Sequence, residues 1–279
     1  MTLVAGLSGH GGLVVFADSQ ETVQGYTKKS VEKIDFWTGG KDKLAFVDAG
    51  AGSAIHIDKL TQMLGATVSR STRANEDMNS IFEAMESIVS LYFKEHIFGR
   101  ALSDKPDLEL IIALQPEGSR AQWFHVADGV ICYVPAMFKS IGIGCHLADF
   151  LLDKLQDFGQ HESELLAVAT YVLKEVKTNI DGCGLNSTIW LLRTDGTREY
   201  FGQDDVAELE AMMNGFNNIV RVAFDAAFDI TVHRSSPQNL PAELETIHDC
   251  YKLWYESLKE RRDAAFRSNY DYEHRLRGT

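Results

Sequence analysis

Residues 2–18, TLVAGLSGHGGLVVFAD, form the stretch that decides the fold expected for this sequence. Two short apolar runs flank the glycine-rich residues 8–12, and this pattern predicts a β-hairpin that turns there. Because the strands of a hairpin run antiparallel, the second strand ends near the point where the first begins. We therefore expect the side chain of Asp18, at the end of the second strand, to lie beside that of Thr2.

Thr2 is a candidate nucleophile because it directly follows the initiator methionine. Threonine is small, so methionine aminopeptidase should be able to remove Met1 and leave Thr2 with a free α-amino group. A threonine hydroxyl needs a proton acceptor before it can attack a carbonyl carbon. An α-amino group, which titrates at roughly 7.7–8.0, is a suitable acceptor. Taken alone, Thr2 is more often merely an exposed first residue of a chain.

Lys33 is a second candidate for catalysis. It follows a polar loop and precedes another apolar run, residues 34–37. A lysine held by Asp18 would place a positive charge near the Thr2 hydroxyl and favour its deprotonation. The structural alternatives are that Asp18 caps a turn and that Lys33 is a solvated charge at a strand edge.

The order and spacing of these residues resembles the proteasome β-subunit family of N-terminal nucleophile (Ntn) hydrolases. In that family the nucleophile and the acidic residue lie sixteen positions apart, which is the separation of Thr2 and Asp18 (18 − 2 = 16). The family's lysine usually lies one position later than Lys33 does, so we interpret the preceding loop as one residue short. The resemblance covers roughly residues 2–205 and includes three further segments: 43–52, 141–144 and 181–184.

The resemblance implies an α+β fold, the four-layer αββα sandwich of Ntn hydrolases. Apolar spacing along the chain predicts strands, two helices, strands, two helices and strands, an order that suits such packing. We assign residues 1–205 to this domain. Residues 206–279 exceed what a typical β subunit needs. Helical spacing at 206–228 and 242–266 predicts a C-terminal helical extension packed on the domain.

The family also implies roles for residues outside the first hairpin. Gly50 matches a glycine whose backbone N–H binds the oxyanion, although a tight turn would also favour glycine here. Asp181 matches an aspartate that supports the nucleophile. The two serines that accompany this aspartate in the family are absent: Ile143 stands in place of one, and the turn around Cys183 lacks the other.

Glu21 and Asp48 correspond to positions that, in the family, face the pocket for the substrate residue preceding the cleaved bond. Both are acidic here, where apolar or small residues are common in the family. A carboxylate at the base of such a pocket would favour peptides with lysine or arginine at that position. The alternative is that Asp48 pairs internally with Lys33 or with another basic residue.

The composition excludes several classes of function. The chain has 279 residues, 45% of them hydrophobic and 24% charged, and its net charge of −13 argues against a nucleic-acid partner. No apolar run approaches the roughly 18 residues of a membrane-spanning helix, and no secretory signal peptide is evident. The four cysteines form no CxxC pair and the nine histidines show no metal spacing. We therefore expect a cytoplasmic protein that needs no metal or other cofactor.

Together these features predict a threonine-type peptidase that acts on peptides or unfolded proteins. Its predicted catalytic residues are Thr2, Asp18 and Lys33. The resemblance implies a homo-oligomeric ring or stacked assembly, with an ATPase as a candidate partner. Two alternatives stay open: an amidase or acyltransferase of the same fold that acts on a small amide, and a ring-forming subunit without activity. The absent serines favour the inactive subunit, whereas the intact catalytic set opposes it.

Overall fold

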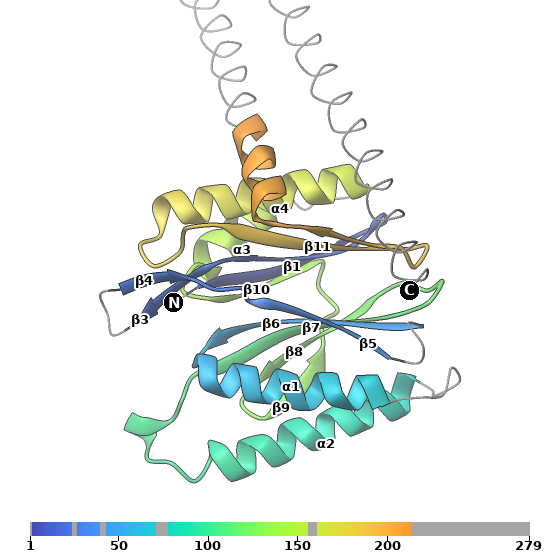
Figure 1. Cartoon of the computed structure of the whole chain (residues 1–279), viewed down its shortest axis with the longest axis vertical. Helices are drawn as coiled ribbons and strands as arrows, with labels where there is room; N and C mark the ends of the chain where they lie inside the picture. Colours follow the sequence, from blue (N-terminus) through green and yellow to red (C-terminus); the bar gives the residue numbers. More distant parts are fainter. Residues whose placement is uncertain (1, 24–26, 40–42, 71–77, 156–160, 214–279) are drawn as a thin grey trace, which may run out of the picture. The chain divides into compact units, whose positions relative to one another are not determined.

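The computed structural model describes most of the chain as far as residue 213 (Figure 1). The described residues are 2–23, 27–39, 43–70, 78–155 and 161–213. The strands β1 to β12 and the helices α1 to α4 belong to one compact unit that ends at Glu210.

The first hairpin forms as the sequence predicts and lies in the interior of a five-stranded sheet. Its strands, β1 (Leu3–Gly9) and β2 (Gly12–Asp18), pair antiparallel. Gly12 has a φ of +148°, and a Cβ atom there would lie 2.2 Å from the carbonyl oxygen of Leu192, so the turn requires glycine. The described strands of this sheet follow the order β10 (Phe138–Gly142), β1, β2, β11 (Ser187–Arg193) and β12 (Arg198–Phe201).

A second five-stranded antiparallel sheet forms from consecutive strands in the described part of the chain. Its order is β5 (Ile34–Gly39), β6 (Leu44–Gly52), β7 (Leu108–Pro116), β8 (Gln122–Ala127) and β9 (Val130–Tyr133). The central strands β6 and β7 are apolar along almost their whole length, which is typical of strands with both faces buried.

Each sheet packs against its own pair of helices (Figure 1). On the β5–β9 sheet, α1 (Ala54–Arg70) and α2 (Met78–His96) bury one apolar stripe each, against residues such as Phe46 and Leu110. On the β1-containing sheet, α3 (Cys145–Leu155) and α4 (Glu162–Asn179) do the same against Leu3 and Phe16. The short 3-10 helix η1 (Leu102–Asp104) precedes β7.

A third apolar cluster joins the opposite faces of the two sheets. It contains Val4 and Val15 from the first sheet and Val47, Ala49 and Ile111 from the second. Successive side chains along a strand point to opposite faces of the sheet. Neighbouring residues of one strand therefore belong to different apolar clusters. The predicted element order and the α+β class are confirmed.

The segment between Asp18 and Lys33, expected to be a polar loop, contains a two-stranded ribbon. Its strands are β3 (Gln20–Val23) and β4 (Thr27–Ser30), and Glu21 lies directly opposite Lys29 in the register. Opposite charges at facing positions can stabilise a pair of strands. Strands of this kind show no alternation of apolar and polar residues, so the sequence pattern does not predict them.

The predicted C-terminal extension lies mostly outside the described residues. Within them, residues 203–213 are helical, starting slightly before the predicted residue 206. Val206 packs into the same core cluster as α4, and Glu210 forms an ion pair with Lys177 at 2.5 Å. The predicted helix at 242–266 and the remainder of 206–228 are outside the described part. No helix in the described part is both long enough and apolar enough to cross a membrane.

Candidate active site

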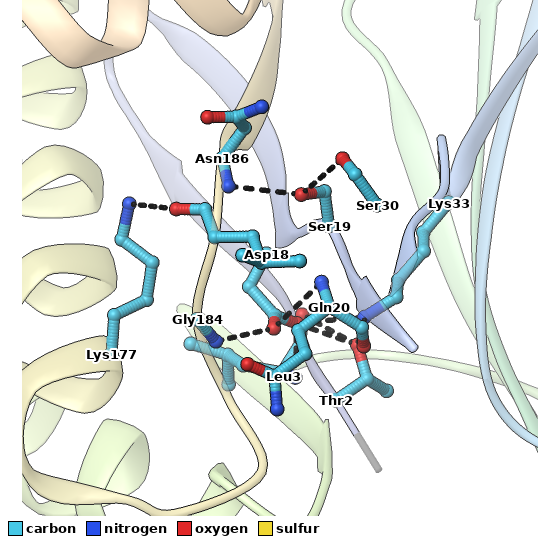
Figure 2. Close-up of polar contacts among 11 residues, drawn as sticks. Thr2, Leu3, Asp18, Ser19, Gln20, Ser30, Lys33, Lys177, Gly184 and Asn186 are labelled. Carbon is cyan, nitrogen blue, oxygen red and sulfur yellow. Dashed lines mark hydrogen bonds and ion pairs between the residues drawn. The ribbon is translucent and has the colours of Figure 1, made fainter. Parts of the chain in front are cut away.

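The structure brings Thr2 and Asp18 together at the open end of the first hairpin (Figure 2). Thr2 immediately precedes β1 and Asp18 is the last residue of β2, so antiparallel pairing places their side chains side by side. The Thr2 hydroxyl donates a hydrogen bond of 2.6 Å to Oδ1 of Asp18. Both residues are buried, with exposed fractions of 4% and 1%. The juxtaposition predicted from the hairpin is therefore present.

Lys33 completes this cluster from the segment that leads into β5. Its Nζ donates to the Thr2 hydroxyl, to Oδ1 of Asp18 at 3.0 Å and to the carbonyl oxygen of Gln20 at 2.6 Å. The Lys33 side chain is 10% exposed and that of Asp18 is fully buried. The pair is thus a buried ion pair with three acceptors around the ammonium group, rather than a solvated strand-edge charge.

Backbone N–H groups hold the Asp18 carboxylate in place. Oδ1 also accepts a hydrogen bond from Leu3 N at 2.8 Å. Oδ2 accepts from Gln20 N at 3.2 Å and from Gly184 N at 2.9 Å. Both carboxylate oxygens therefore accept hydrogen bonds, and the three backbone donors come from three separate segments of the chain. Together these bonds fix the orientation of Asp18 toward Thr2.

Burial lowers the pKa of Lys33 below its ordinary value, although the charge of Asp18 and the hydrogen bond to it act in the opposite direction. A lysine whose ammonium form is less stable gives up its proton more readily. In its ion pair with Asp18, the ammonium group of Lys33 is placed to stabilise the deprotonated Thr2 oxygen.

Cys183 lies beside this cluster, in the turn where the family resemblance expects a serine. It is buried, and burial together with the nearby negative charge of Asp18 raises the pKa of its thiol to about 12. The thiol is therefore neutral at ordinary pH and packs in the core cluster that contains Leu3. The turn contributes to the site through the N–H group of Gly184, not through a side-chain hydroxyl.

Asp181, the predicted supporting residue, is exposed, whereas Thr2 is buried. Its side chain is fully exposed and lies 3.5 Å from Nζ of Lys28, on the β3–β4 ribbon. Its supporting role stays a prediction.

Gly50, the predicted oxyanion donor, lies within β6. The β5 register ends at the pair Ile34–Ala49, whereas the β7 register continues to Gly52, so Gly50 is the first position that β5 leaves unpaired. A Cβ atom at Gly50 would lie 2.5 Å from the Ile57 side chain of α1. Close packing therefore accounts for glycine at this position, and oxyanion binding stays a prediction.

Of the two predicted pocket residues, Glu21 lies partly buried on β3. Its negative charge is close enough to Lys33 to raise the pKa of the lysine slightly against the effect of burial. Asp48 is buried on β6 with an exposed fraction of 1%. It does not pair with Lys33, and neither of its oxygens has a hydrogen-bond partner in the described structure. The residue directly opposite Asp48 is Asp35, on β5, which sequence analysis did not single out.

Solved structures similar to this chain are found, although at low sequence identity. No family model and no curated protein matches the sequence. Similar solved structures include an Anbu Gly-1 mutant from Hyphomicrobium sp. strain MC1, at 16% identity and a TM-score of 0.64, covering 81% of this chain and 99% of that one. Anbu (ancestral beta-subunit) from Yersinia bercovieri has 13% identity and a TM-score of 0.66, covering 80% and 96%.

A third match comes from the helical assembly of the Anbu complex of Pseudomonas aeruginosa, with 12% identity, a TM-score of 0.66 and coverage of 80% and 96%. At such low identities the similarity establishes the fold alone. The predicted membership of the proteasome β-subunit family was wrong, because the matching structures are those of Anbu, a related but distinct proteasome-like protein, and no family model supports the β-subunit assignment.

Proposed function

We propose that this chain is a threonine-type peptidase of the N-terminal nucleophile class, with Thr2 as nucleophile after removal of Met1. The observation that supports the proposal most strongly is the bonding of the Thr2 hydroxyl to both Asp18 and Lys33 in a buried cluster. A threonine used only to begin a strand needs neither a buried carboxylate nor a buried lysine beside its hydroxyl.

In the proposed reaction, the Thr2 oxygen attacks the carbonyl carbon of a peptide bond. The hydroxyl proton passes to the free α-amino group of Thr2, and then to the departing amine as the C–N bond breaks. The resulting ester on Thr2 is hydrolysed by water, which regenerates the hydroxyl. Lys33 stabilises the attacking oxygen, Asp18 orients Lys33 and Thr2, and the Gly50 N–H group binds the oxyanion.

The proposal includes the four-layer αββα arrangement of Ntn hydrolases for residues 1–205. The three apolar clusters support it, because two contain helix and sheet residues and one lies between the sheets. The boundary with a C-terminal extension at residue 206 is part of the same proposal. We place the protein in the cytoplasm, without a metal or other cofactor.

We further propose that the chain forms a homo-oligomer that encloses its active sites. The solved Anbu complex from Pseudomonas aeruginosa is a helical assembly, and this supports oligomerisation of a chain with the same fold. Peptides or unfolded proteins are the proposed substrates, and an ATPase that supplies unfolded chains is a candidate partner.

A second candidate function is that of a structural subunit without activity. It is favoured by the exposed Asp181, and by Ile143 and Cys183 at positions where hydroxyl groups would assist proton transfer. The amidase or acyltransferase alternative uses the same nucleophile and differs only in its substrate.

The experiment that separates these functions is hydrolysis of a fluorogenic peptide panel by the purified full-length chain and by Thr2→Ala and Thr2→Ser. Thr2→Ala should lose at least about 10³-fold in kcat/KM, because the nucleophile is absent. Thr2→Ser retains a hydroxyl and should keep measurable activity. Both variants still begin with a residue small enough for Met1 removal.

Undiminished hydrolysis by Thr2→Ala would rule out the proposed mechanism. An inactive wild type with an intact fold would favour the structural subunit. Activity confined to small amides would favour the amidase. Thermal unfolding of the three proteins provides the control for folding.

A further inference from the structure

Four basic side chains gather where the start of α1 meets the end of α2. The two helices run antiparallel (Figure 1), and this brings together His56 and Lys59 of α1, His96 of α2, and Arg100 just beyond α2. Nζ of Lys59 lies 3.2 Å from Nε2 of His96. Nε of Arg100 donates a hydrogen bond of 2.7 Å to the carbonyl oxygen of His96. We call these four residues the α1–α2 basic cluster.

The buried ring of Tyr92, on α2, lies beneath the cluster. The Tyr92 hydroxyl is 2.8 Å from Nδ1 of His56, and the ring centroids of Tyr92 and His96 are 4.7 Å apart. Nζ of Lys59 lies 5.9 Å from the centroid of the Tyr92 ring. Tyr92 is 1% exposed, whereas Lys59 and Arg100 are exposed and the two histidines are half-buried. The cluster is therefore held on a rigid base and is open to a ligand from solvent.

The described residues do not balance the charge of this cluster. No ion pair in the described part of the chain includes Lys59 or Arg100. Glu95, which precedes His96, is exposed and belongs to none of these pairs either. Burial lowers the pKa of His56, and the positive charges of the other three members of the cluster lower it further. This accumulation of positive charge occurs in a chain whose net charge is −13.

Helix dipoles account for only half of the cluster. Cations near the C-terminus of a helix are stabilised by its partial negative charge, and this explains the two members at the end of α2. His56 and Lys59 lie in the first two turns of α1, where the partial positive charge of the N-terminus favours an anion. The first turn of α1 contains no acidic residue, and the charge of Asp58, in the second turn, acts on Asp35 of β5. An anion would relieve this unfavourable placement of two basic residues.

The closest pair in the cluster leads to the same conclusion. Repulsion between two positive charges 3.2 Å apart is strong, so Lys59 and His96 can both be charged only beside an anion. With Nε of Arg100 bonded to the backbone, its terminal N–H groups have no partner among the residues that the structure describes. Lys59, His96 and Arg100 therefore have donor capacity that the protein itself does not use.

A phosphate group suits these donors better than a carboxylate does. Arginine binds phosphate through two parallel N–H···O bonds, and lysine contributes a point charge. A carboxylate offers two oxygens and one negative charge. A phosphate monoester has three free oxygens and a charge of about −1.5 to −2 at pH 7, which matches four basic groups more closely.

We propose that the α1–α2 basic cluster binds a phosphate group, either that of free phosphate or that of a small monoester. Its oxygens accept hydrogen bonds from Lys59, from Arg100 and from protonated His96, and the charge of His56 supports them. None of these residues belongs to the cluster of Thr2, so the site does not depend on the proposed peptidase function.

A ³¹P NMR titration of the full-length chain tests the proposal. The probes are inorganic phosphate and methyl phosphate, each added at constant ionic strength maintained with sodium chloride. Lys59→Gln and Arg100→Gln each remove one charge from an exposed position, so the fold should persist. The matched control is Lys154→Gln, because Lys154 is exposed on α3 and lies 5.9 Å from the ring of Phe150, the same distance as between Lys59 and its ring. Thermal unfolding of each variant verifies the fold.

The expected result is saturable binding of phosphate by the wild type. Lys59→Gln and Arg100→Gln should each weaken it by at least about tenfold, and Lys154→Gln should leave it unchanged. Methyl phosphate that binds at least as tightly as phosphate would identify a monoester as the ligand, and weaker binding would identify free phosphate. The proposal is overturned if phosphate binding does not saturate, or if it survives both cluster substitutions.

Discussion

Two equally buried carboxylates, Asp18 and Asp48, occupy neighbouring regions of the molecule in opposite chemical situations. Asp18, at the end of the first hairpin, accepts hydrogen bonds from one hydroxyl, three backbone N–H groups and Lys33. Asp48, in the second sheet, has no donor among the described residues and faces Asp35 across the register. The first region is organised before any substrate arrives, whereas the second holds a buried carboxyl group that no described residue satisfies.

The largest expected effect comes from removing the charged partner of Asp18. Lys33→Met preserves much of the side-chain length but removes the ammonium group, so Asp18 becomes a buried carboxylate without a countercharge, as Asp48 is. Loss of one partner of a buried ion pair costs about 3–5 kcal/mol of stability. Activity should fall by at least about 10³-fold, because the catalytic groups act as a unit. Chemical denaturation and peptide hydrolysis measure the two effects.

Lys33→Arg is the matched control for charge. It preserves the positive charge but cannot release its proton at neutral pH. Substantial activity in Lys33→Arg would show that Lys33 acts by its charge alone. Full activity in Lys33→Met would contradict the role assigned to Lys33.

The same substitution at the two carboxylates should have different effects. Asp18→Asn replaces an acceptor oxygen with an NH₂ group in a position where every neighbour is a donor, and should destabilise the protein by about 3 kcal/mol. Asp48→Asn loses no hydrogen bond and removes a poorly solvated acid, so stability should change by less than about 1 kcal/mol or increase. Denaturant midpoints at pH 8 test the pair. Equal losses at both positions would mean that Asp48 has a partner.

A smaller effect should appear in the dependence of stability on pH. Because burial raises the pKa of Asp48, the folded state binds a proton more readily than the unfolded state above pH 3.8, the ordinary value. The resulting contribution to stability is complete below that value and is lost as the pH rises toward the raised pKa, by about 1.4 kcal/mol for each pH unit crossed.

The wild type should therefore lose stability relative to Asp48→Asn as the pH increases from 5 to 8. Thermal unfolding of both proteins across this range gives the difference directly. A difference that is independent of pH would mean that Asp48 titrates normally.

Sequence reasoning found the pair Thr2 and Asp18 because their spacing depends on one hairpin. Two apolar strands joined by a glycine-rich turn fix the relative positions of Thr2 and Asp18, and side-chain types alone indicate their chemistry. The helices were equally predictable, since α1 and α2 show regular apolar spacing.

The groups that sequence reasoning missed are indicated neither by residue type nor by the spacing of apolar residues. The carbonyl group of Gln20 and the N–H group of Gly184 belong to the backbone, so no residue type reveals them. The β3–β4 ribbon places Glu21 opposite Lys29 and shows no alternation of apolar and polar residues that would predict it. Asp35 escaped notice because its position opposite Asp48 depends on the β5–β6 register, which the sequence alone does not disclose.

The central claim, that Thr2 is a nucleophile with a free amino group, is tested most directly by intact mass spectrometry after treatment with a peptide epoxyketone. Such an inhibitor reacts with both the hydroxyl and the α-amino group of an N-terminal threonine. We predict a wild-type mass that lacks Met1 and carries one inhibitor molecule, and a Thr2→Ala mass that carries none. A chain that retains Met1, or one that loses Met1 and stays unmodified, would contradict the claim.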